Sequence, residues 1–341
     1  MINFNFGGNK KEESVGLDIG SYSVKVVSMG KEGGKNVLSA YNIKRIPTDQ
    51  KSVRIENVIK ETFEEIDLHP ESINLSISGP DVIVRFINLP KMTKQQLEGA
   101  LSFEAEKYIP FDINEVVLDS IVLGAGAEAG QMQVLLAAAK RELIESVVHI
   151  AEKLDMSVNL LDISPFAVFN AFSVANQPAE DSGTAFLHIG HSQTDVLVSI
   201  GGVPSFMRQI QIGGKDVTAA ICKGMSISAE EAEERKLGLG EVDTDAVLAL
   251  TTSVLEDLIK EVQLSMGYFE NRYNKNVSEV FCSGGMIYQP GVIEFLVEKL
   301  GIEVKQWNPV KGIDVTDTIS KEDVDSVAAQ LAVSIGLAIR D

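Results

Sequence analysis

The chain carries the same pattern of three predicted β-strands twice, about half a chain apart. Strand-like segments at 15–19, 24–29 and 36–46 are repeated at 184–189, 194–200 and 204–212, and turns that contain glycine join the strands in both sets. A predicted helix at 53–66 and a strand at 73–78 follow the first set. Because 341 residues suit two or three domains, the repeat predicts two related α/β lobes.

A small module is predicted between the two sets. Its elements are a strand at 82–89, a helix at 93–108, strands at 116–123 and 132–139, and a helix at 141–154. Thr93 followed by Gln96 is the capping-box arrangement of a helix start. A strand at 158–161 and a helix at 165–175 then return to the first lobe.

These patterns divide the chain into five predicted parts. They are a flexible leader (1–13), a first lobe in two segments (14–80 and 157–180), the inserted module (81–156), a second lobe in two segments (181–228 and 276–341) and a helical subdomain (229–275). The polar stretch 176–183 is the predicted linker. A strand at 277–282, a helix to residue 300, a strand at 303–305 and a final helix at 324–339 are expected in the second lobe.

The net charge of the chain indicates which kinds of partner it can bind. The net charge is −19 and the pI is near 4.7, whereas nucleic acids and anionic lipids are bound by surfaces rich in lysine and arginine. Cys222 and Cys282 stand alone in their segments, which excludes a disulfide framework and a thiolate metal site and fits a reducing compartment. We find no signal peptide and no apolar run of membrane-spanning length. We therefore expect a cytoplasmic protein that reaches a membrane only through a partner and has no nucleic-acid partner.

The turn between the first two strands has the chemistry of a phosphate-binding turn. Gly20 lacks a Cβ and lets backbone N–H groups turn toward a phosphate. Ser21 and Ser23 add hydroxyl donors, and Lys25 adds a positive charge. Asp18 is the predicted ligand of Mg²⁺ through water, because Mg²⁺ binds few carboxylates and keeps several waters. An ordinary hairpin with surface serines is the alternative interpretation.

The equivalent turn of the second set carries similar groups. Gly190 and the residues after it, which are His191, Ser192 and Gln193, can present backbone N–H groups to the same phosphates from the opposite side. His188 and His191 could form a metal pair. No carboxylate or cysteine surrounds them at a recognised ligand spacing, so we do not expect zinc.

Two later segments can contact a nucleoside. Gly284 and Gly285 follow a predicted strand and lead into a predicted helix, so that a flat ring can lie against the backbone. A plain strand–helix turn would have the same sequence. Glu233 and Lys236 share one helix face and can bracket a ribose, although such a charged run is usually a solvated face.

Taken in order along the chain, these four segments resemble the motifs of the actin, sugar-kinase and chaperone ATPase superfamily, which has two phosphate motifs and an adenosine motif. The inserted module resembles that of the FtsA and PilM branch. The segments LPKMTKQQLEGALSFEAEKYIPFDINEVVLD (89–119), GGKDVT (213–218) and ISAEEAEERK (227–236) are similar to the PilM family of type IV pilus assembly proteins. The resemblance implies an α/β, actin-like (ribonuclease H-like) fold of two lobes with a nucleotide cleft between them.

The resemblance implies ATP and Mg²⁺ as the cofactors of that cleft. It places Gly20, Ser21, Ser23 and Lys25 on the phosphates, and Glu233, Lys236, Gly284 and Gly285 on the nucleoside. The complete predicted cofactor-binding set is Asp18, Gly20, Ser21, Tyr22, Ser23, Lys25, Gly190, His191, Ser192, Gln193, Gly213, Gly214, Lys215, Glu233, Lys236, Gly284 and Gly285, with Asp18 as the metal residue.

The same resemblance implies a protein partner. PilM proteins bind the N-terminal cytoplasmic peptide of the membrane protein PilN in a groove beside the inserted module, for which we expect the region 82–119. The protein would then lie at the inner face of the inner membrane and contact other pilus motor or platform proteins. It would link the motor side of the pilus machinery to the alignment complex and serve twitching motility.

One position departs from the superfamily. His188 stands where the second phosphate motif usually has an aspartate that serves Mg²⁺ or the attacking water, and the loss of that carboxylate weakens catalysis more than binding. We therefore expect ATP to be a structural or regulatory ligand, hydrolysed slowly or not at all, and the chain to be at most a weak ATPase. An FtsA-like filament protein linked to a membrane and a small-molecule kinase stay open as alternatives, although we find no carboxylate base for a kinase.

Overall fold

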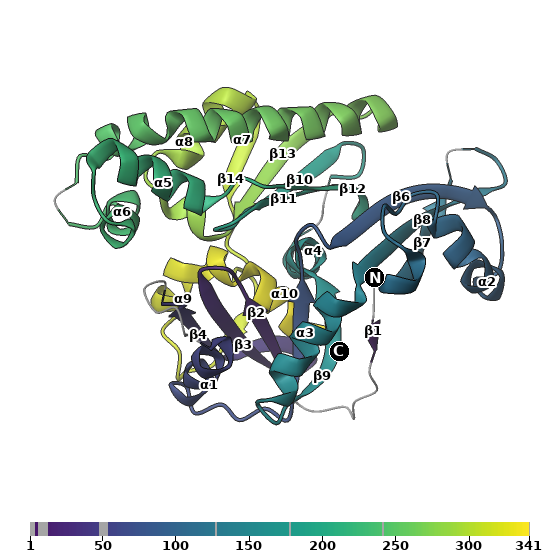
Figure 1. Cartoon of the computed structure of the whole chain (residues 1–341), viewed down its shortest axis with the longest axis horizontal. Helices are drawn as coiled ribbons and strands as arrows, with labels where there is room; N and C mark the ends of the chain where they lie inside the picture. Colours follow the sequence, from purple (N-terminus) through teal and green to yellow (C-terminus); the bar gives the residue numbers. More distant parts are fainter. Residues whose placement is uncertain are drawn as a thin grey trace.

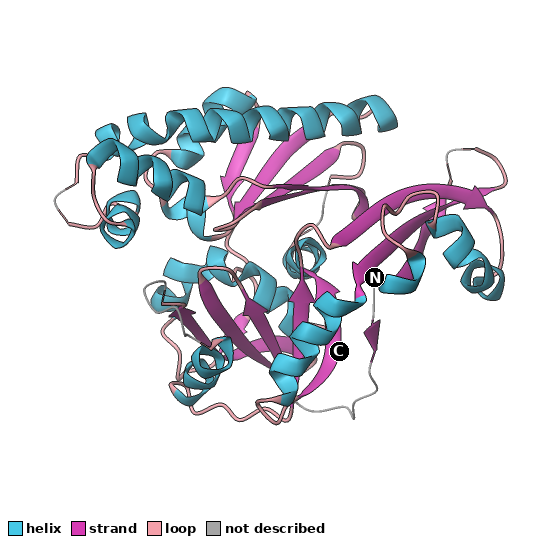
Figure 2. Cartoon of the chain, viewed as in Figure 1, coloured by secondary structure: helices cyan, strands magenta, loops and turns pink. Residues whose placement is uncertain are grey.

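The computed structural model describes residues 4–5, 13–47, 54–126, 128–176, 179–240 and 242–340. Two α/β lobes lie one above the other, and a small module projects to one side (Figure 1). Each lobe holds a sheet that is covered by helices (Figure 2). Within the described ranges, no helix is long and apolar enough to cross a membrane.

The first lobe is built on a seven-stranded sheet with the order β1-β9-β5-β2-β3-β4-β15. β2, β3 and β4 are the first predicted triplet and form an antiparallel meander. β5 pairs with β2, and β9 pairs with β5, both in parallel, so the carboxyl ends of these three strands lie at the same edge. The strands are β1 (Phe4–Asn5), β2 (Glu13–Ile19), β3 (Ser23–Glu32), β4 (Lys35–Arg45), β5 (Ser72–Ile77), β9 (Ser157–Ile163) and β15 (Asp314–Val315).

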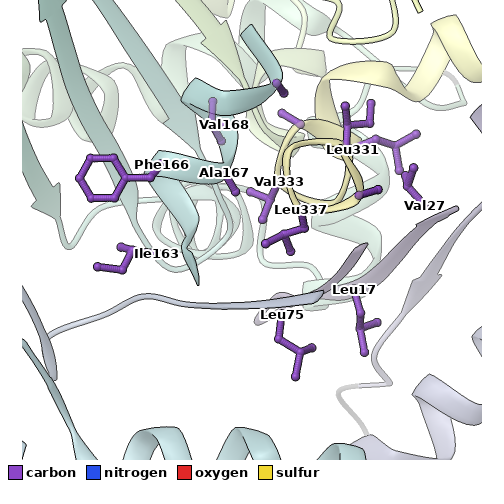
Figure 3. Packing of buried hydrophobic residues seen from close by; sticks show 14 of the residues in the cluster. Leu17, Val27, Leu75, Ile163, Phe166, Ala167, Val168, Leu331, Val333 and Leu337 are labelled. Atoms are coloured by element: carbon purple, nitrogen blue, oxygen red, sulfur yellow. The ribbon is translucent and has the colours of Figure 1, made fainter. Parts of the chain in front are cut away.

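Helices cover both faces of this sheet. On one face, α4 (Ser164–Ala175) packs against α10 (Ala332–Ala338), and α10 lies on β2. Val333 and Leu337 of α10 point into this contact, whereas Leu17 and Leu75 point from the sheet toward its other face (Figure 3). On that other face lie α1 (Ile55–Glu64) and α3 (Arg141–Glu152) (Figure 1). Gly336 makes the helix contact close, because a Cβ at this position would overlap the carbonyl oxygen of Ala167.

The second lobe repeats this plan with a five-stranded sheet of order β12-β11-β10-β13-β14. β10, β11 and β12 form the second antiparallel triplet, and β13 and β14 extend it in parallel. This topology confirms the predicted duplication. The elements are β10 (Gly183–Ile189), β11 (Thr194–Ile200), β12 (Val203–Ile210), α5 (Gly214–Met225), α6 (Ala229–Lys236), α7 (Thr244–Tyr273), β13 (Val277–Ser283), the 3-10 turn η2 (Gly285–Tyr288), α8 (Val292–Leu300) and β14 (Glu303–Gln306).

An aromatic cluster joins the two lobes below the cleft that separates them. The ring of Phe172, on α4, lies 4.7 Å from the rings of Phe186 and Phe281 and 5.7 Å from that of Trp307. Pairs at these separations favour tilted and edge-to-face packing, and they contribute about 0.5 to 1.5 kcal/mol each beyond their buried area. The lobes therefore share a hydrophobic floor.

The inserted module has the first four elements of the predicted order: strand, helix, strand, strand. The fifth, the helix expected at 141–154, is α3, which packs on β5 and β9 of the first lobe as well as on β8. The antiparallel sheet of the module has the order β6-β8-β7, and the hydrophobic core between this sheet and α2 is separate from those of the lobes. Thr93 and Gln96 make both hydrogen bonds of the predicted capping box. The elements are β6 (Val82–Pro90), α2 (Lys94–Ala105), the 3-10 turn η1 (Ile113–Glu115), β7 (Val116–Ala125) and β8 (Gln131–Lys140).

The C-terminal segment differs from the prediction. The sequence placed 276–341 in the second lobe, but β15 pairs with β4 and α10 packs on β2, so the end of the described chain completes the first lobe. The single helix expected at 324–339 is divided into α9 (Lys321–Val327), the 3-10 turn η3 (Ala328–Leu331) and α10. Tertiary contacts explain the interruption, because Ala329 accepts a hydrogen bond from the Gly284 N–H and donates one to the Tyr288 hydroxyl.

Four other expectations need correction or lie partly outside the described residues. The helix expected directly after Gly285 is only the 3-10 turn η2, and α8 starts at Val292. Within the predicted leader 1–13, Phe4–Asn5 forms β1 and Glu13 opens β2, while 1–3 and 6–12 lie outside the described residues. Two further segments lie outside the described residues: 48–53, where the first helix was expected to begin, and 177–178 in the predicted linker.

Candidate functional site

A cleft of about 500 Å³ lies between the two lobes. The turns that follow β2 and β10 face it from opposite sides, and the carboxyl ends of β5 and β13 also open into it. A cleft at strand ends and between domains is the usual place of a ligand site in an α/β protein.

The turn between β2 and β3 holds a buried charge pair. Lys25 Nζ lies 3.0 Å from Asp18 Oδ2, and the residue Asp18 is 8% exposed. The Gly20 N–H donates to Ser23 O at 3.1 Å, which closes the turn. A Cβ on Gly20 would lie 2.8 Å from Lys25 Nζ, so a larger residue would displace the lysine. The turn thus keeps an ammonium group at the wall of the cleft.

The turn between β10 and β11 is supported by the start of α5. The Gly190 N–H donates to Gln193 O at 2.9 Å, and the N–H groups of Gly214 and Lys215 donate to Gly190 O and His191 O at 2.9 and 2.8 Å. The positive end of the α5 dipole therefore lies directly behind this turn, where it favours an anion.

The two turns touch each other across the mouth of the cleft. Ser21 Oγ donates to Ser192 Oγ at 3.1 Å, and the rings of Tyr22 and His191 are 4.9 Å apart. The guanidinium group of Arg45 lies 5.1 Å from the centre of the Tyr22 ring. The equivalent turns of the two repeats are thus brought to one place, as the sequence predicts.

His188 and Asp195 lie deeper on the second wall. Nδ1 of His188 is 3.0 Å from Ser283 Oγ, and burial lowers the pKa of His188 to about 4, so the imidazole is neutral at pH 7. Burial also raises the pKa of Asp195 to about 7, and the charge of Asp18 adds to the shift. Gln193 Nε2 opposes it by donating to Asp195 Oδ1 at 2.9 Å.

The predicted nucleoside end of the cleft contains a second buried charge pair. Lys236 Nζ lies 2.6 Å from Glu233 Oε2, both residues are buried, and Thr218 donates to Glu233. Burial lowers the pKa of Lys236. Gly284 has φ of 95°, and a Cβ on it would overlap the backbone of Ile189. The backbone after β13 therefore passes close to the end of β10 here.

All predicted cofactor-binding residues line the cleft except Gly213 and Lys215. Gly213 supports the wall from behind, because a Cβ on it would lie 2.6 Å from His191 O, and its N–H donates to Asp216. Lys215 is exposed and contributes its backbone N–H to the β10–β11 turn. Nucleotide contact by any of the predicted residues stays a prediction.

Several lining residues were not predicted. They are Ile19, Ser76, Ile77, Ser78, Gly79, Pro80, Leu143, Val147, Ile150, Ser164, Asp195, Gln211, Leu237, Met286, Gln330 and Val333. His188, which the sequence places in the second phosphate motif, lines the cleft as well. If the parallel pairing of β5 with β2 had been predicted, it would have placed Ser78 and Gly79 at the carboxyl edge of the sheet, which opens into the cleft. Asp195 had a signal too, since a carboxylate within an otherwise apolar strand is rare in a core.

The described residues hold no group of three or more His, Cys, Asp or Glu side chains that could bind a metal by themselves. Mg²⁺ usually takes one or two carboxylates and completes its shell with waters and substrate phosphates. Asp18, at the base of the phosphate-type turn, fits that donor set.

The inserted module also contacts the second lobe. The hydroxyl of Tyr273, at the end of α7, donates to Ser205 O on β12 at 2.7 Å and accepts from Gln133 Nε2 on β8 at 3.0 Å. Beside it, Arg272 donates to Phe86 O on β6 at 2.6 Å. We call the contacts of Arg272, Tyr273, Gln133, Ser205 and Phe86 the α7 bridge. It ties the module to the lobe that carries the β10–β11 turn.

Comparison with known proteins identifies relatives over the whole fold. Residues 16–341 match the family model described as type IV pilus assembly protein PilM. A solved PilM-PilN type IV pilus biogenesis complex is 28% identical with a TM-score of 0.86, and the alignment covers 97% of this chain and 99% of that one. FtsA of Streptococcus pneumoniae is 24% identical over 86% of this chain and 75% of its own length. MreB5 of Spiroplasma citri, solved with AMPPNP, shares the fold at 10% identity and a TM-score of 0.53, with 96% and 95% of the two chains covered. The predicted actin-like fold is confirmed.

Proposed function

Because this chain belongs to the PilM family of type IV pilus assembly proteins, we propose that it is an ATP-binding scaffold that holds the N-terminal cytoplasmic peptide of PilN. In this role it works at the inner face of the inner membrane and links the motor side of the machinery to the alignment complex. The observation that carries the proposal is the meeting of the two repeated glycine turns, with Ser21 and Ser192 in contact, above Asp18 and Lys25.

ATP binding is supported by the chemistry of the two turns. Lys25 supplies a positive charge, Ser21 and Ser192 supply hydroxyl donors from opposite lobes, and α5 supplies the positive end of its dipole. Mg²⁺, when bound, would neutralise phosphate charge, with Asp18 as the carboxylate that holds it through water. The similarity of fold to MreB5, which was solved with AMPPNP and with ADP, agrees with this assignment.

Slow hydrolysis is supported by His188. A neutral imidazole occupies the place where the superfamily has a carboxylate, and it is held by Ser283. Phosphoryl transfer depends on positioned metal and water, so this cleft is better suited to holding ATP than to cleaving it.

PilN binding is supported by the likeness to the PilM-PilN complex and by the α7 bridge. The bridge joins the module, whose residues 82–119 we propose as part of the peptide groove, to the lobe that carries the second phosphate turn. A change in the angle between the lobes must move or break these contacts. ATP that orders the cleft can therefore order the groove as well.

The proposal is tested by titrating a fluorescent peptide with the N-terminal cytoplasmic sequence of PilN, and a scrambled control, with the purified chain. We expect binding of the native peptide alone, slowed hydrogen exchange within 82–119, and ATP turnover well below ~1 s⁻¹, the low end of kinase rates. Failure to bind the peptide with and without ATP-Mg²⁺ would contradict the scaffold role. Faster turnover by the isolated chain would contradict the binding-only role of ATP.

The FtsA relative keeps a second function open. FtsA of Streptococcus pneumoniae aligns with most of this chain, and we consider an FtsA-like filament as the alternative. Sedimentation with ATP and with liposomes separates the two, because a scaffold that reaches the membrane through a partner stays in the supernatant.

A further inference from the structure

The chain passes between the first lobe and the inserted module at two places. The first crossing, 78–81, connects β5 to β6, and the second is the junction of β8 with α3 at Lys140 and Arg141. The two crossings are joined, because the Lys140 N–H donates to Asp81 O at 3.1 Å and Lys140 Nζ lies 2.6 Å from Asp81 Oδ1. We call residues 78–81, 140 and 141 the neck of the module.

Gln209, on β12, connects the second lobe to this neck. In the amide orientation that satisfies both of its polar atoms, Gln209 Nε2 donates to Gly79 O at 2.8 Å and Gln209 Oε1 accepts from the Gly79 N–H at 3.2 Å. Gly79 is buried and has φ of 103°, a conformation that favours glycine. Two hydrogen bonds to one residue fix the direction of the neck relative to β12 as well as its distance.

The Gln209 amide also contacts the wall of the cleft that carries the second phosphate turn. Gln209 and Asp195 lie directly opposite each other in the β11–β12 pair. Burial raises the pKa of Asp195, and hydrogen bonds from Gln193 and Gln209 oppose that shift. Gln193 belongs to the β10–β11 turn, and its Nε2 donates to Asp195 Oδ1 at 2.9 Å. A continuous series of contacts therefore runs from that turn through Asp195 and Gln209 to Gly79.

The contact at the neck is separate from the α7 bridge. The bridge contacts β6 at Phe86, whereas Gln209 contacts Gly79, three residues before β6 begins. Gly79 continues from β5 of the first lobe and lines the cleft, and Gln209 belongs to the second lobe. The two hydrogen bonds therefore join both lobes at the root of the module, and their lengths depend on the angle between the lobes.

We propose that Gln209 positions the inserted module: its carboxamide fixes the neck to the second lobe, so that a ligand which draws the two lobes together in the cleft also fixes the module. Gln209 is not among the described residues that line the cleft, so it acts on a ligand there only through Asp195 and Gly79. The identification of that ligand with ATP rests on the proposed function. A contact with a purely structural role would stabilise the protein but would not respond to a ligand.

The test measures hydrogen exchange of the backbone amides of residues 78–83 by mass spectrometry, with and without ATP-Mg²⁺. In the parent protein we expect ATP-Mg²⁺ to slow this exchange by about fivefold or more, the factor that corresponds to one net hydrogen bond. Gln209→Leu keeps the size of the side chain but removes both hydrogen bonds to Gly79. Without ATP the segment should exchange about fivefold faster in this variant than in the parent, and ATP should no longer slow it.

The matched control is Arg208→Leu, at the neighbouring position of β12. Successive side chains of a strand point to opposite faces, and Arg208 pairs with Glu261 at 2.6 Å, so this variant should keep the response of the parent. Gln209→Glu guards against a packing defect in the leucine variant, because it keeps the shape of the side chain but its carboxylate cannot donate to Gly79 O. It should lose the response as well. Melting curves and calorimetry show whether each protein is folded and binds ATP.

Loss of the ATP effect in both Gln209 variants, with the control unchanged, supports the inference. An effect of the same size in Gln209→Leu and in the parent overturns it. So does the absence of any effect on residues 78–83 in a parent that binds ATP, a result that leaves the proposed function intact. A parent that does not bind ATP contradicts the proposed function, and the role of Gln209 falls with it.

Discussion

The hydroxyl of Ser21 donates to the hydroxyl of Ser192 at 3.1 Å, although 171 residues separate them along the chain. Ser21 directly follows Gly20 and Ser192 is the second residue after the equivalent Gly190, so this contact joins the equivalent turns of the two repeats. An exposed hydroxyl pair of this kind contributes little by itself. An anion held by both turns would exchange it for stronger, charge-assisted bonds from each lobe.

Lys25→Met should weaken ATP binding and leave the fold intact. Methionine keeps most of the buried stem of the lysine but loses the charge, and hydrogen bonds to charged groups contribute about 1.5 to 3 kcal/mol. This corresponds to roughly a 10- to 100-fold rise in the Kd for ATP, measured by calorimetry. The control is Lys223→Met on the exposed side of α5, where we expect no change. Equal affinities for both variants would remove Lys25 from the site.

His188→Asp should raise ATP turnover, because it restores a carboxylate at the wall of the cleft. We expect an increase of about tenfold or more in phosphate release in the presence of Mg²⁺. His188→Asn, whose side chain is similar in size to aspartate but has no charge, is the matched control, and its ATP turnover should stay slow. If the aspartate variant binds ATP but turns over no faster than the asparagine variant, the missing carboxylate does not limit hydrolysis.

Tyr273→Phe should reduce the effect of ATP on the affinity for the PilN peptide. The change removes the hydroxyl shared by Ser205 and Gln133 and keeps the ring. One hydrogen bond contributes about 1 kcal/mol, so the ratio of Kd values without and with ATP should fall by about fivefold. Tyr268→Phe, on the same helix but 57% exposed, is the control. An unchanged ratio in Tyr273→Phe would exclude the α7 bridge from the coupling.

Asp195→Asn should stabilise the protein at alkaline pH. Since the pKa of Asp195 is near 7 in the folded chain and 3.8 is the ordinary value, the folded state holds a proton that the unfolded state has lost between these limits. The free energy of unfolding therefore falls as pH rises, by up to about 1.4 kcal/mol per pH unit, and levels off above pH 7. The melting temperature of Asp195→Asn should exceed that of the parent at pH 8, and the difference should shrink toward pH 4.

The control for this pH dependence is Asp181→Asn, since the Asp181 carboxylate is fully exposed. The difference in melting temperature between Asp181→Asn and the parent should not change between pH 4 and pH 8. A pH-independent difference for Asp195→Asn would show that Asp195 is ionised throughout.

Gly336→Ala should be severely destabilising, whereas Gly99→Ala should be mildly stabilising. The new Cβ at Gly336 would overlap Ala167 O, and overpacking costs about 1 to 3 kcal/mol or more. At Gly99, in the exposed part of α2, nothing lies within 4 Å of a Cβ, and alanine improves helix propensity by about 1 kcal/mol. Urea unfolding of both variants measures the contrast. Similar shifts would mean that α10 does not approach α4 as closely as the structure shows.

The strand triplets and the inserted module could be predicted because their information is local. Alternating apolar residues between glycine turns mark β2, β3 and β4 and their repeats, and Thr93 with Gln96 marks the start of α2. The family resemblance added the meeting of the two turns, which no local pattern contains.

The C-terminal segment could not be predicted, because its shape is set by distant partners. β15 has only two residues and forms by pairing with β4. The stretch 324–339 is apolar at helical spacing throughout, so the interruption at η3 depends on the contacts of Ala329 with Gly284 and Tyr288.

The missed cleft residues have a related explanation. Leu143 and Val147 are apolar at helical spacing on α3 and look like core residues, but this face of the helix lines the cleft. Asp195 lies near the start of β11, directly after Thr194, and a charged residue at a strand end is typical of a solvent-facing position. Only the packing of the second lobe against the first encloses it.

The position of α10 on β2 and α4 also sets an order for folding during synthesis. The strands and helices of the second lobe, from β10 to β14, are complete once residue 306 has left the ribosome. The first lobe begins earlier but lacks the helix that covers β2 on the α4 side until α10 emerges. Domains usually fold in the order in which they are made. In this chain the lobe that is started first waits for α10, so the first lobe is complete only after residues 332–338 have been translated.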